Sequence, residues 1–402
     1  MSKFFKRLSA LASVTLMSIM LLVGFYGSAL PDSYQISEGE KLMINSLFSI
    51  SARPCREKVT AAVTGGDSKG DETLMLFGAV PIKDVKAKTT ERPSLIPCGQ
   101  AFGIKLITDG VMVVDLTKVN GVCPASECGI KEGDIIVSIN GSTVKSNADV
   151  SKIISGSKGQ PCSVIVKRDG ASKTLNLVPT MADGSYKAGM WVRDSSAGIG
   201  TITYFDPTNN TFGGLGHPIC DSDTKEILPL SEGTAGEVRI TGCTKSENGK
   251  PGQLLGEFKG SAALGSILSN CSDGVFGILN ENPSKRKALP MAFRQEVHTG
   301  SAYILTSIDG GEPKEYSISI EQVNMNGGEH DLVVKITDPE LIAKSGGIVQ
   351  GMSGSPIIQD GRLVGAVTHV FIDDPLMGYG IFAESMYQKS STLSDNDVSL
   401  AG

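Results

Sequence analysis

Two serines stand in a glycine-rich loop near the C-terminal end of the sequence. The loop reads Gly351-Met352-Ser353-Gly354-Ser355-Pro356 and leads directly into an apolar run. Glycine is needed in such a loop because a side chain would block a close approach and the required φ values. Consecutive backbone N–H groups can then point at one spot and stabilise the oxyanion of a tetrahedral intermediate. The loop therefore predicts a serine nucleophile, with an oxyanion hole made by the amides of Gly351 and Ser353.

The order of residues in this loop is similar to the Gly-Asp-Ser-Gly-Gly-Pro loop of chymotrypsin-like serine proteases. The alignment places the nucleophile at Ser353, while Ser355 stands where that family has glycine, so Ser355 remains the alternative nucleophile. An Asp360-Gly361 turn then joins two strands, so the serine loop enters a hairpin. The competing interpretation is that both serines are small residues that satisfy tight backbone geometry.

A serine hydroxyl is inert without a general base, and four histidines are available. They are His217, His298, His330 and His369. His217 lies on a tight loop rich in glycine, far upstream of the serine, which matches the His-then-Ser order of chymotrypsin-like enzymes. His369 follows the serine hairpin on a strand, where an imidazole is more often packed than catalytic. We therefore expect His217 to be the base, with His369 as its rival and the other two on the surface.

The acid that would orient the base is less well defined. Asp338 lies between His217 and Ser353 in the sequence and preserves the His–Asp–Ser order, although it stands only 15 residues before the serine. Three further candidates are Asp194, Asp221 and Asp223. Each of these aspartates could instead be a turn residue. Asp338 is the predicted third catalytic residue.

The N-terminus predicts export. Lys3, Lys6 and Arg7 precede a mostly apolar run from Leu8 to Tyr26, which is long enough to cross a hydrocarbon core as a helix. The basic flank should stay in the cytoplasm and the rest of the chain should be exported. Small residues at 27–29 would also suit a signal peptidase, so a retained anchor and a cleaved signal (residues 1–30) both remain open.

Composition limits the ligands. The formal net charge is −6, and no basic stripe is interleaved with aromatic residues, so no nucleic-acid partner is expected. Eight cysteines in an exported chain permit disulfides, and Cys123 could pair with Cys128, or all eight could be small buried residues. None of them, Cys55 included, lies in Cys-x-x-Cys or at zinc spacing from histidine. Neither a metal site nor a cofactor is expected.

Three further regions of the sequence, residues 31–96, 97–180 and 185–395, are expected to position these residues. Residues 31–96 read as a small β-rich region without evident chemistry. Residues 97–180 resemble a PDZ domain, because Gly133-Asp134 turns into an apolar strand, Asn140-Gly141 turns out of it, and residues 147–157 fit a short helix capped by Asn147. PDZ domains bind extended peptides by adding a strand to a sheet edge. The resemblance implies a peptide-binding loop and edge at residues 99–106, with Gly99, Phe102, Gly103 and Ile104 as its contacts.

Residues 185–395 alternate short strands with glycine, asparagine and aspartate turns, and no long amphipathic helix is evident there. This rhythm favours an all-β double barrel or sandwich. The predicted fold is therefore mainly β: an N-terminal membrane-anchoring helix, a small β region, a PDZ-like domain and a chymotrypsin-like double β-barrel protease domain.

These features together resemble the stage IV sporulation protein B peptidases of endospore-forming bacteria, a family of sporulation signalling serine peptidases. The resemblance rests on the PDZ-like domain before the protease, on "WVRDSSAGIGTITYFDP", on "GGLGHPI" and on the serine loop. It implies a serine endopeptidase anchored in the forespore inner membrane and facing the intermembrane space. The resemblance also implies cleavage of itself and of a membrane-bound regulatory protein, which allows a late sigma factor to be processed, and it assigns His217, Asp338 and Ser353 to catalysis.

Two other functions are compatible with the same residues. An exported PDZ-containing scaffold without a working triad would share the fold, because a fold does not guarantee activity. A general quality-control protease of the HtrA type is the third interpretation, although those enzymes usually place PDZ domains after the protease. The sequence leaves the cleaved bond, the disulfide pairs and the oligomeric state open.

Overall fold

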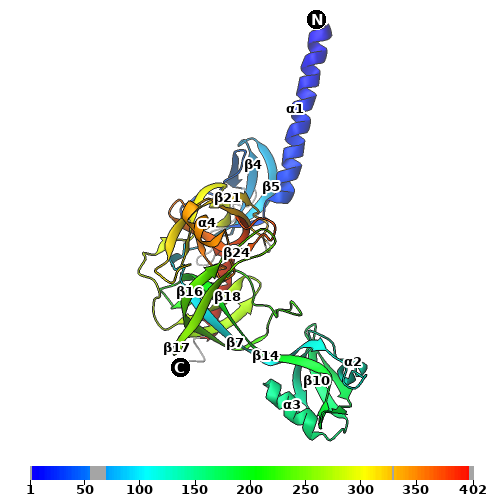
Figure 1. Cartoon of the computed structure of the whole chain (residues 1–402). Helices are drawn as coiled ribbons and strands as arrows, with labels where there is room; N and C mark the ends of the chain where they lie inside the picture. Colours follow the sequence, from blue (N-terminus) through cyan, green and yellow to red (C-terminus); the bar gives the residue numbers. More distant parts are fainter. Residues whose placement is uncertain (1, 55–68, 328–329, 398–402) are drawn as a thin grey trace.

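The computed structural model describes residues 2–54, 69–327 and 330–397. Helix α1(Ser2–Ala29) projects from one end, a small unit with two short helices lies at the other end, and β-barrels lie between them (Figure 1). The fold is mostly β. This confirms the predicted fold class of an apolar N-terminal helix, a PDZ-like domain and a double β-barrel.

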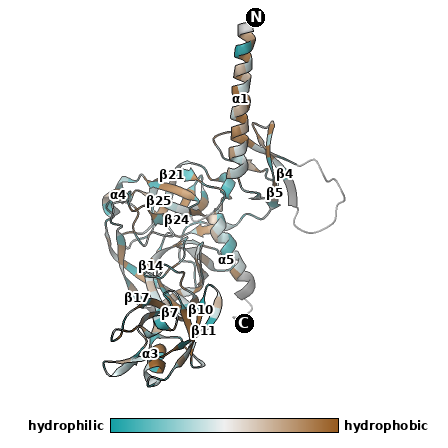
Figure 2. Cartoon of the chain, turned by 90° about the vertical axis from the view of Figure 1, so that its right-hand side faces the viewer, coloured by the Kyte–Doolittle hydropathy of each residue, from teal (hydrophilic) through white to brown (hydrophobic). Residues whose placement is uncertain are grey.

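The C-terminal end of helix α1 packs against a small five-stranded sheet. In spatial order the strands are β1(Ser33–Ile36), β5(Val80–Thr89), β4(Lys69–Leu76), β3(Ile50–Pro54) and β2(Met43–Ile44). The hydrophobic colouring of α1 in Figure 2 matches its apolar sequence, and its residues 4–18 are all exposed. Tyr26 and Leu30 are only 7% and 5% exposed, because they pack against Leu74, Leu76 and Val85 of the sheet. The C-terminal end of the helix is therefore part of a folded core.

The first barrel closes through two long strands. Its ring runs β7(Ala101–Leu116), β16(Leu230–Thr244), β17(Gln253–Cys271), β18(Gly274–Leu279), β15(Thr211–Gly214) and β14(Met190–Phe205), and β14 pairs back onto β7. Strands β6(Ser94–Pro97) and β19(Leu289–Pro290) continue from β14. Inside the ring, the rings of Phe102 and Phe212 meet edge to face at 5.8 Å. A buried apolar core therefore fills this barrel.

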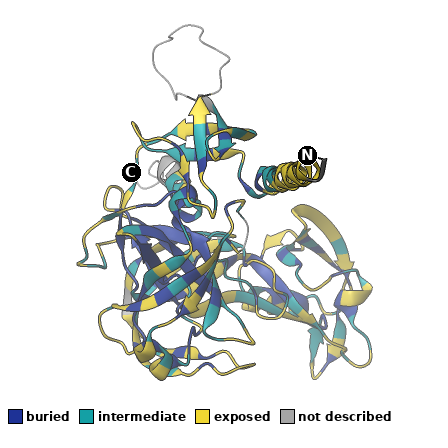
Figure 3. Ribbon diagram, turned by 90° about the horizontal axis from the view of Figure 1, so that it is seen from above, coloured by how far each residue is buried: buried dark blue, intermediate teal, exposed yellow. Residues whose placement is uncertain are grey.

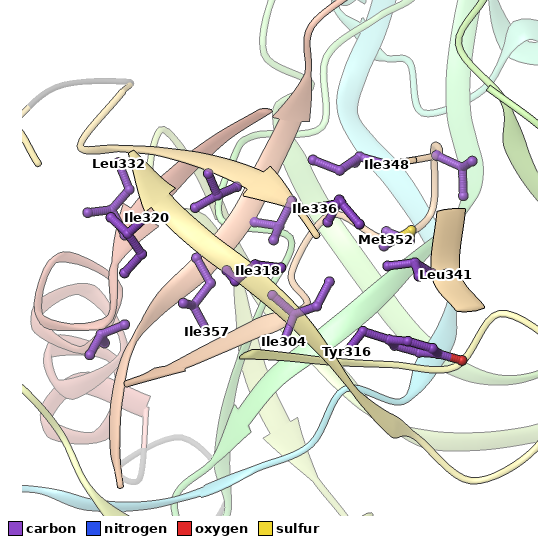
Figure 4. Packing of buried hydrophobic residues seen from close by; sticks show 14 of the residues in the cluster. Ile304, Tyr316, Ile318, Ile320, Leu332, Ile336, Leu341, Ile348, Met352 and Ile357 are labelled. Carbon is purple, nitrogen blue, oxygen red and sulfur yellow. The ribbon is translucent and has the colours of Figure 1, made fainter. Parts of the chain in front are cut away.

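The second barrel is closed and follows in the sequence. Its ring is β20(Gly300–Thr306), β21(Lys314–Val323), β22(Leu332–Ile336), β25(Met377–Phe382), β24(Arg362–Val370) and β23(Pro356–Gln359). Alternate residues of β21, Tyr316, Ile318 and Ile320, point inward, as the period of two in a strand requires. They pack with Ile304 and Ile357 (Figure 4), and Figure 3 shows buried residues concentrated in the barrels.

The PDZ-like unit (residues 111–192) is inserted into the first barrel. It contains α2(Pro124–Glu127), β8(Ile135–Ile139), β9(Ser142–Thr143), α3(Asn147–Gly156), β10(Cys162–Arg168), β11(Ala171–Leu177), β12(Thr180–Ala182) and β13(Ser185–Lys187). Strand β7 leaves the barrel to enter this unit, and β14 returns from it. The division into residues 97–180 and 185–395 remains a prediction; in the structure the first strand of the barrel, β7, precedes the PDZ-like unit in the sequence.

Local signals were largely correct. The turns at Asn140-Gly141 and Asp360-Gly361 have positive φ and join strands as predicted, and Asp169-Gly170 makes a third turn of this kind. Helix α3 begins as expected, but its N-cap is Ser146, whose side chain accepts from Asp149 N in a capping box. None of the seven cysteines that the structure describes forms a disulfide, so Cys123 and Cys128 do not pair. Cys55 lies outside the described residues.

Two further helices and a 3-10 turn accompany the second barrel. They are α4(Pro339–Ser345), α5(Ala383–Asp397) and η1(Arg294–Glu296). The expectation of no long helix after residue 185 was wrong, because α5 is anchored by buried contacts on one side. Met386 is fully buried, and the hydroxyls of Tyr204 and Ser390 lie 2.9 Å apart. The other residues of α5 are mostly polar, so the sequence shows no clear apolar stripe for this helix.

A buried ion pair in the PDZ-like unit generates a stability prediction. Asp134 is fully buried, and Arg168 donates to both of its carboxylate oxygens, at 2.6 and 2.7 Å. Arg168→Ala would leave that charge buried without its partner, so we expect the unit to lose about 3–5 kcal/mol. Urea unfolding followed by hydrogen exchange of β8 and β10 measures the loss.

The neighbouring residue supplies the matched control. Lys167 pairs with Asp109 at 3.0 Å, but both side chains are about half exposed. Lys167→Ala should therefore change the stability by less than about 1 kcal/mol. Equal losses for the two variants would show that the burial of Asp134 does not decide the stability of this unit.

Candidate active site

A cavity of about 680 Å³ lies between the two barrels and contains both predicted reactive residues. Ser353 enters it from the loop before β23 of the second barrel, and His217 enters it from the loop after β15 of the first. Thr368 and His369 of β24 line the same cavity. The structure therefore brings together two groups that are 136 positions apart in the sequence.

The serine loop is fixed by contacts that only glycine allows. Gly354 has a φ of +94°, and a Cβ there would lie 2.0 Å from the carbonyl oxygen of Thr201. Thr201 also donates twice to the loop: its N–H to Ser353 O at 3.0 Å and its hydroxyl to Gly351 O at 2.7 Å. Strand β14 of the first barrel therefore holds the loop of the second.

The two serines have different surroundings. Ser355 is fully buried, and its hydroxyl donates to Met352 O at 2.6 Å within the loop. Ser353 is half-buried and lines the cavity, and its hydroxyl donates to Thr368 O at 2.6 Å. Within the described chain, no hydrogen bond is made by the N–H of Gly351 or Ser353, the amides predicted for the oxyanion hole. Only Ser353 combines access to the cavity with free amides beside it.

His217 is held in one tautomer. Its Nδ1 lies 2.8 Å from the carbonyl oxygen of Pro218. A carbonyl oxygen can only accept, so Nδ1 carries the proton and Nε2 of the neutral ring keeps its lone pair. Leu215, two residues earlier, has a φ of +64°, which is uncommon for a branched side chain. That conformation aims the histidine loop at the second barrel, where a Cβ on Gly216 would meet Ile381 and Thr368.

The electrostatics around His217 favour the neutral ring. Burial and, to a smaller extent, the nearby His369 together lower the pKa of His217 to about 4, although the hydrogen bond to Pro218 opposes this shift. The two imidazole rings lie 4.4 Å apart, inclined by 36°. His217 can therefore accept a proton across the neutral pH range, while the Ser353 hydroxyl must first turn away from Thr368 O.

Asp338 was predicted to orient His217, and the structure does not bring the two together. Its carboxylate caps α4 by accepting from Glu340 N and Leu341 N, and it also accepts from Ser317 N at 3.2 Å. The three rival aspartates are engaged as well: Asp194 accepts from Asn147 N, and Arg193 pairs with both Asp221 and Asp223. The hydrogen-bond partner that fixes His217 is the backbone carbonyl of Pro218.

The predicted peptide-binding edge also needs correction. Gly99, Phe102, Gly103 and Ile104 lie at the barrel end of β7 or just before it, where Ile104 pairs with Gly198 of β14 on one side and Ala235 of β16 on the other. Both edges of this stretch are occupied, so it cannot take an added strand. The sequence does not show that β7 belongs to both the barrel and the PDZ-like unit, so it does not show that this edge is occupied.

A groove at the other end of the unit has the expected character. A cavity of about 640 Å³ lies between α3 and the first residues of β14, lined by Val150 and Ile154 of the helix and by Met190 and Trp191 of the strand. In the described chain these strand residues pair only with β7, so the edge facing α3 is open. The sequence signal that marks it is a glycine, Gly189, directly before an apolar pair.

The double barrel, with Ser353 and His217 in the cleft, defines a serine peptidase. A family model for the SpoIVB peptidase S55 matches residues 184–387, just over half of the chain, and a PDZ domain model matches residues 99–178. The chain belongs to the SpoIVB peptidase S55 family.

Other similarities are shorter or weaker. A putative zinc metalloprotease of Lactococcus lactis is 42% identical over 67 residues, and one of Clostridium acetobutylicum is 33% identical over 86 residues. These matches cover 17% and 21% of this chain, and only 16% and 25% of those proteins.

Among solved structures, the Rv3671c protease of M. tuberculosis in its active form is 15% identical, with a TM-score of 0.30, and the match covers 49% of this chain and 74% of that one. The PDZ domain of an SdrC-like protein of Listeria monocytogenes is 24% identical, with a TM-score of 0.19 over 21% of this chain and 87% of that one.

The lowered pKa of His217 gives a pH prediction. In the unfolded chain this residue should bind its proton near pH 6.5, whereas the folded chain should bind it only near pH 4. The contribution of His217 to stability is therefore complete above pH 6.5 and is lost as the pH falls toward 4. NMR titration of the ¹³C-labelled histidine rings, in the folded chain and in the unfolded chain, measures the two pKa values of His217.

His298 is the internal control. The carbonyl of Thr299 and the carboxylate of Asp360 raise its pKa, so it should titrate above pH 6.5 in the same sample. His369→Gln removes one cause of the low pKa of His217, which should then rise but stay below 6.5 because burial remains. A His217 pKa at or above 6.5 in the intact chain would contradict the assigned surroundings.

Proposed function

We propose that this chain is an exported serine endopeptidase in which Ser353 attacks the substrate and His217 accepts its proton. The observation that carries the proposal is the cavity that both residues line, with Nε2 of His217 left as an acceptor by the Pro218 carbonyl. Rotation of the Ser353 hydroxyl from Thr368 O toward Nε2 is a side-chain motion of picoseconds to nanoseconds.

The proposed reaction uses groups that are already placed. Ser353 Oγ bonds to the carbonyl carbon of the scissile peptide while its proton passes to Nε2 of His217. The resulting oxyanion accepts hydrogen bonds from the N–H groups of Gly351 and Ser353. Nε2–H then protonates the departing amine, and water repeats the sequence on the acyl-enzyme. Throughout, the Pro218 carbonyl accepts from Nδ1–H and steadies the charged ring.

Asp338 has a proposed positioning role. It caps α4, and α4 leads through Gly346 and Gly347 into the serine loop. Gly347 has a φ of +137° and a Cβ there would meet Pro375 O at 2.2 Å, so this connection has little freedom. Loss of the cap should therefore be felt at Ser353, although the carboxylate does not touch the reacting atoms.

We further propose that α1 is retained as a membrane anchor. Tyr26 and Leu30 belong to the core of the small sheet, and Asn326 donates to Ser28 O at 3.0 Å, so cleavage after Ala29 would break a packed junction. Membership of the SpoIVB peptidase family supports a place in the forespore inner membrane, facing the intermembrane space. The proposed substrates are the chain itself and a membrane-bound regulatory protein of sigma-factor processing.

Active-site labelling tests the nucleophile. A fluorophosphonate probe should label the intact chain and should fail to label Ser353→Ala or His217→Ala. Ser355→Ala is the matched control, because it removes a buried hydroxyl from the same loop at about 1 kcal/mol and should keep the labelling. Labelling that is lost in Ser355→Ala and kept in Ser353→Ala would reverse the assignment, and a folded chain that is never labelled would favour a scaffold.

Asp338→Asn separates capping from catalysis in the same assay. Asparagine caps a helix about as well as aspartate, so this variant should stay within a few-fold of the intact chain, whereas Asp338→Ala should lose about 1 kcal/mol of stability and part of the labelling. A folded Asp338→Asn chain that is labelled a thousandfold more slowly would restore the aspartate as a charged catalytic partner.

The groove beside α3 is the proposed peptide site. A bound peptide would add a strand to the open edge of β14, with its apolar side chains toward Val150 and Ile154. Trp191 is the only tryptophan of the chain and is 61% exposed at this groove, so its fluorescence is a built-in reporter. A heptapeptide ending in a free valine carboxylate should shift the emission, and its C-terminal amide should shift it less.

Ser155→Phe supplies the control for this titration, since it fills the groove from α3 without touching the strand edge. It should abolish the shift while the unfolding transition stays unchanged. An unchanged emission with every peptide in the intact chain would remove the proposed site.

A further inference from the structure

The tip of the β4–β5 hairpin exposes apolar side chains. Phe77 is 51% exposed, and its N–H donates to Ser49 O at 2.8 Å, which joins the tip to the β2–β3 turn. That turn carries Leu47, 90% exposed, and Phe48, whose ring meets the ring of Phe77 edge to face at 5.8 Å. We call these three side chains, with Val80, the apolar tip. They form one continuous surface.

The backbone conformation at position 77 does not favour a phenylalanine. It and Gly78 have φ values of 53° and 66°, the conformation that favours asparagine or aspartate before glycine. The hairpins of the chain with the same turn follow that preference: Asn140-Gly141, Asp169-Gly170, Asp183-Gly184 and Asp360-Gly361. A phenylalanine in this position is strained by its backbone and gains only partial burial. Its side chain therefore has a role outside the protein core.

The tip lies beside the membrane helix. Val80 and Ile82 share a core cluster with Leu22 and Tyr26 of α1, and Figures 1 and 2 both show the hairpin rising along the helix. Lys83 donates to Leu30 O, which fixes the lower end of this contact. From this contact, the three residues from Lys83 to Val80 rise about 10 Å along the strand, and the eight residues from Leu30 to Leu22 rise about 12 Å along the helix. Val80 therefore lies close to the level of Leu22.

The helix sets the level of the bilayer. Its apolar stretch, Phe4–Ala29, contains an 18-residue window with a mean hydropathy of 2.1 that the rest of the described chain does not bury, whereas Tyr26 near its end packs on the small sheet. With Lys6 and Arg7 among the cytoplasmic headgroups, the hydrocarbon core takes about 20 residues and ends near residue 27. The level of Leu22 is then several ångströms inside the far leaflet.

Polar side chains begin at the level of the turn and continue below it. Arg53 donates to Gly78 O, Lys83 pairs with Asp32 at 2.7 Å, and Thr73 donates to Asp84 at 2.6 Å. The small sheet thus changes from apolar to charged along the direction of α1. Such an order matches the passage from acyl chains to headgroups, where basic side chains meet lipid phosphates.

We propose that the apolar tip inserts into the extracytoplasmic leaflet of the bilayer that α1 spans, as a second contact with lipid. The proposal rests on α1 being a retained anchor. Its occupant is the acyl-chain boundary of a phospholipid leaflet, because the surface continues the uncovered face of α1 at the same depth. The contact fixes the tilt of the barrels on the membrane, which a single helix followed by Pro31 would not do.

Depth-dependent quenching tests the insertion. In full-length Trp191→Phe chains, single tryptophans are introduced as Phe77→Trp in the tip, Phe25→Trp in α1 and Met181→Trp in the PDZ-like unit. Each chain is reconstituted in phosphatidylglycerol bilayers with brominated acyl chains. We expect the first two to be quenched at least twofold and the third to be unaffected. Quenching at 25 without quenching at 77 overturns the proposal and leaves the anchor in place.

Absence of quenching at both positions overturns the anchor, and the inserted tip with it. Leu47→Trp is a second reporter if Phe77→Trp does not fold, because Leu47 is 90% exposed and tolerates replacement. Phe77→Asn gives the matched control. It suits a φ of 53°, so the fold should be kept, yet the quenching of Leu47→Trp should fall at least twofold in that background. Unchanged quenching there shows that Phe77 does not hold the tip in lipid.

Discussion

The pairing of β7 with β14 is the constraint on which this molecule depends. These two strands close the first barrel, leave it together, and form part of the sheet of the PDZ-like unit. The same β14 offers its open edge to the groove beside α3, lines the active-site cavity with Ser196 and Ile199, and holds the serine loop through Thr201. The groove and the nucleophile are thus connected by one continuous strand without a flexible linker.

The active site depends on backbone groups more than on charged side chains. The tautomer of His217 is set by the Pro218 carbonyl, and the loop of Ser353 is set by Thr201 and by glycines with positive φ. An imidazole with such a low pKa is a weak base, but it is unprotonated at neutral pH. Among the described residues that line the cavity none is a carboxylate, so no buried negative charge has to be desolvated there.

The sequence was informative wherever a local pattern decides a local structure. Glycine turns, the apolar helix, and the loops that carry Ser353 and His217 were all predicted from short stretches. The predictions failed where a residue's role depends on a partner that is distant in the sequence. Asp338 was assigned by its order in the sequence, but the N–H groups of α4 take its carboxylate. Ile104 was assigned to a free edge, but β16 arrives there some 130 residues later.

The inserted PDZ-like unit also acts on how the chain folds. Strands β7 and β14 are separated by 73 residues, a large loop to close if the strands had to meet by diffusion alone. The unit folds from contacts within itself, and in doing so it places Leu116 opposite Met190, the far end of the β7–β14 pair. From that point the two strands can zip toward Thr201 one residue pair at a time. The insertion thus holds the far ends of β7 and β14 together at Leu116 and Met190, so the rest of the pair, from there to Thr201, closes a shorter loop than the sequence separation implies.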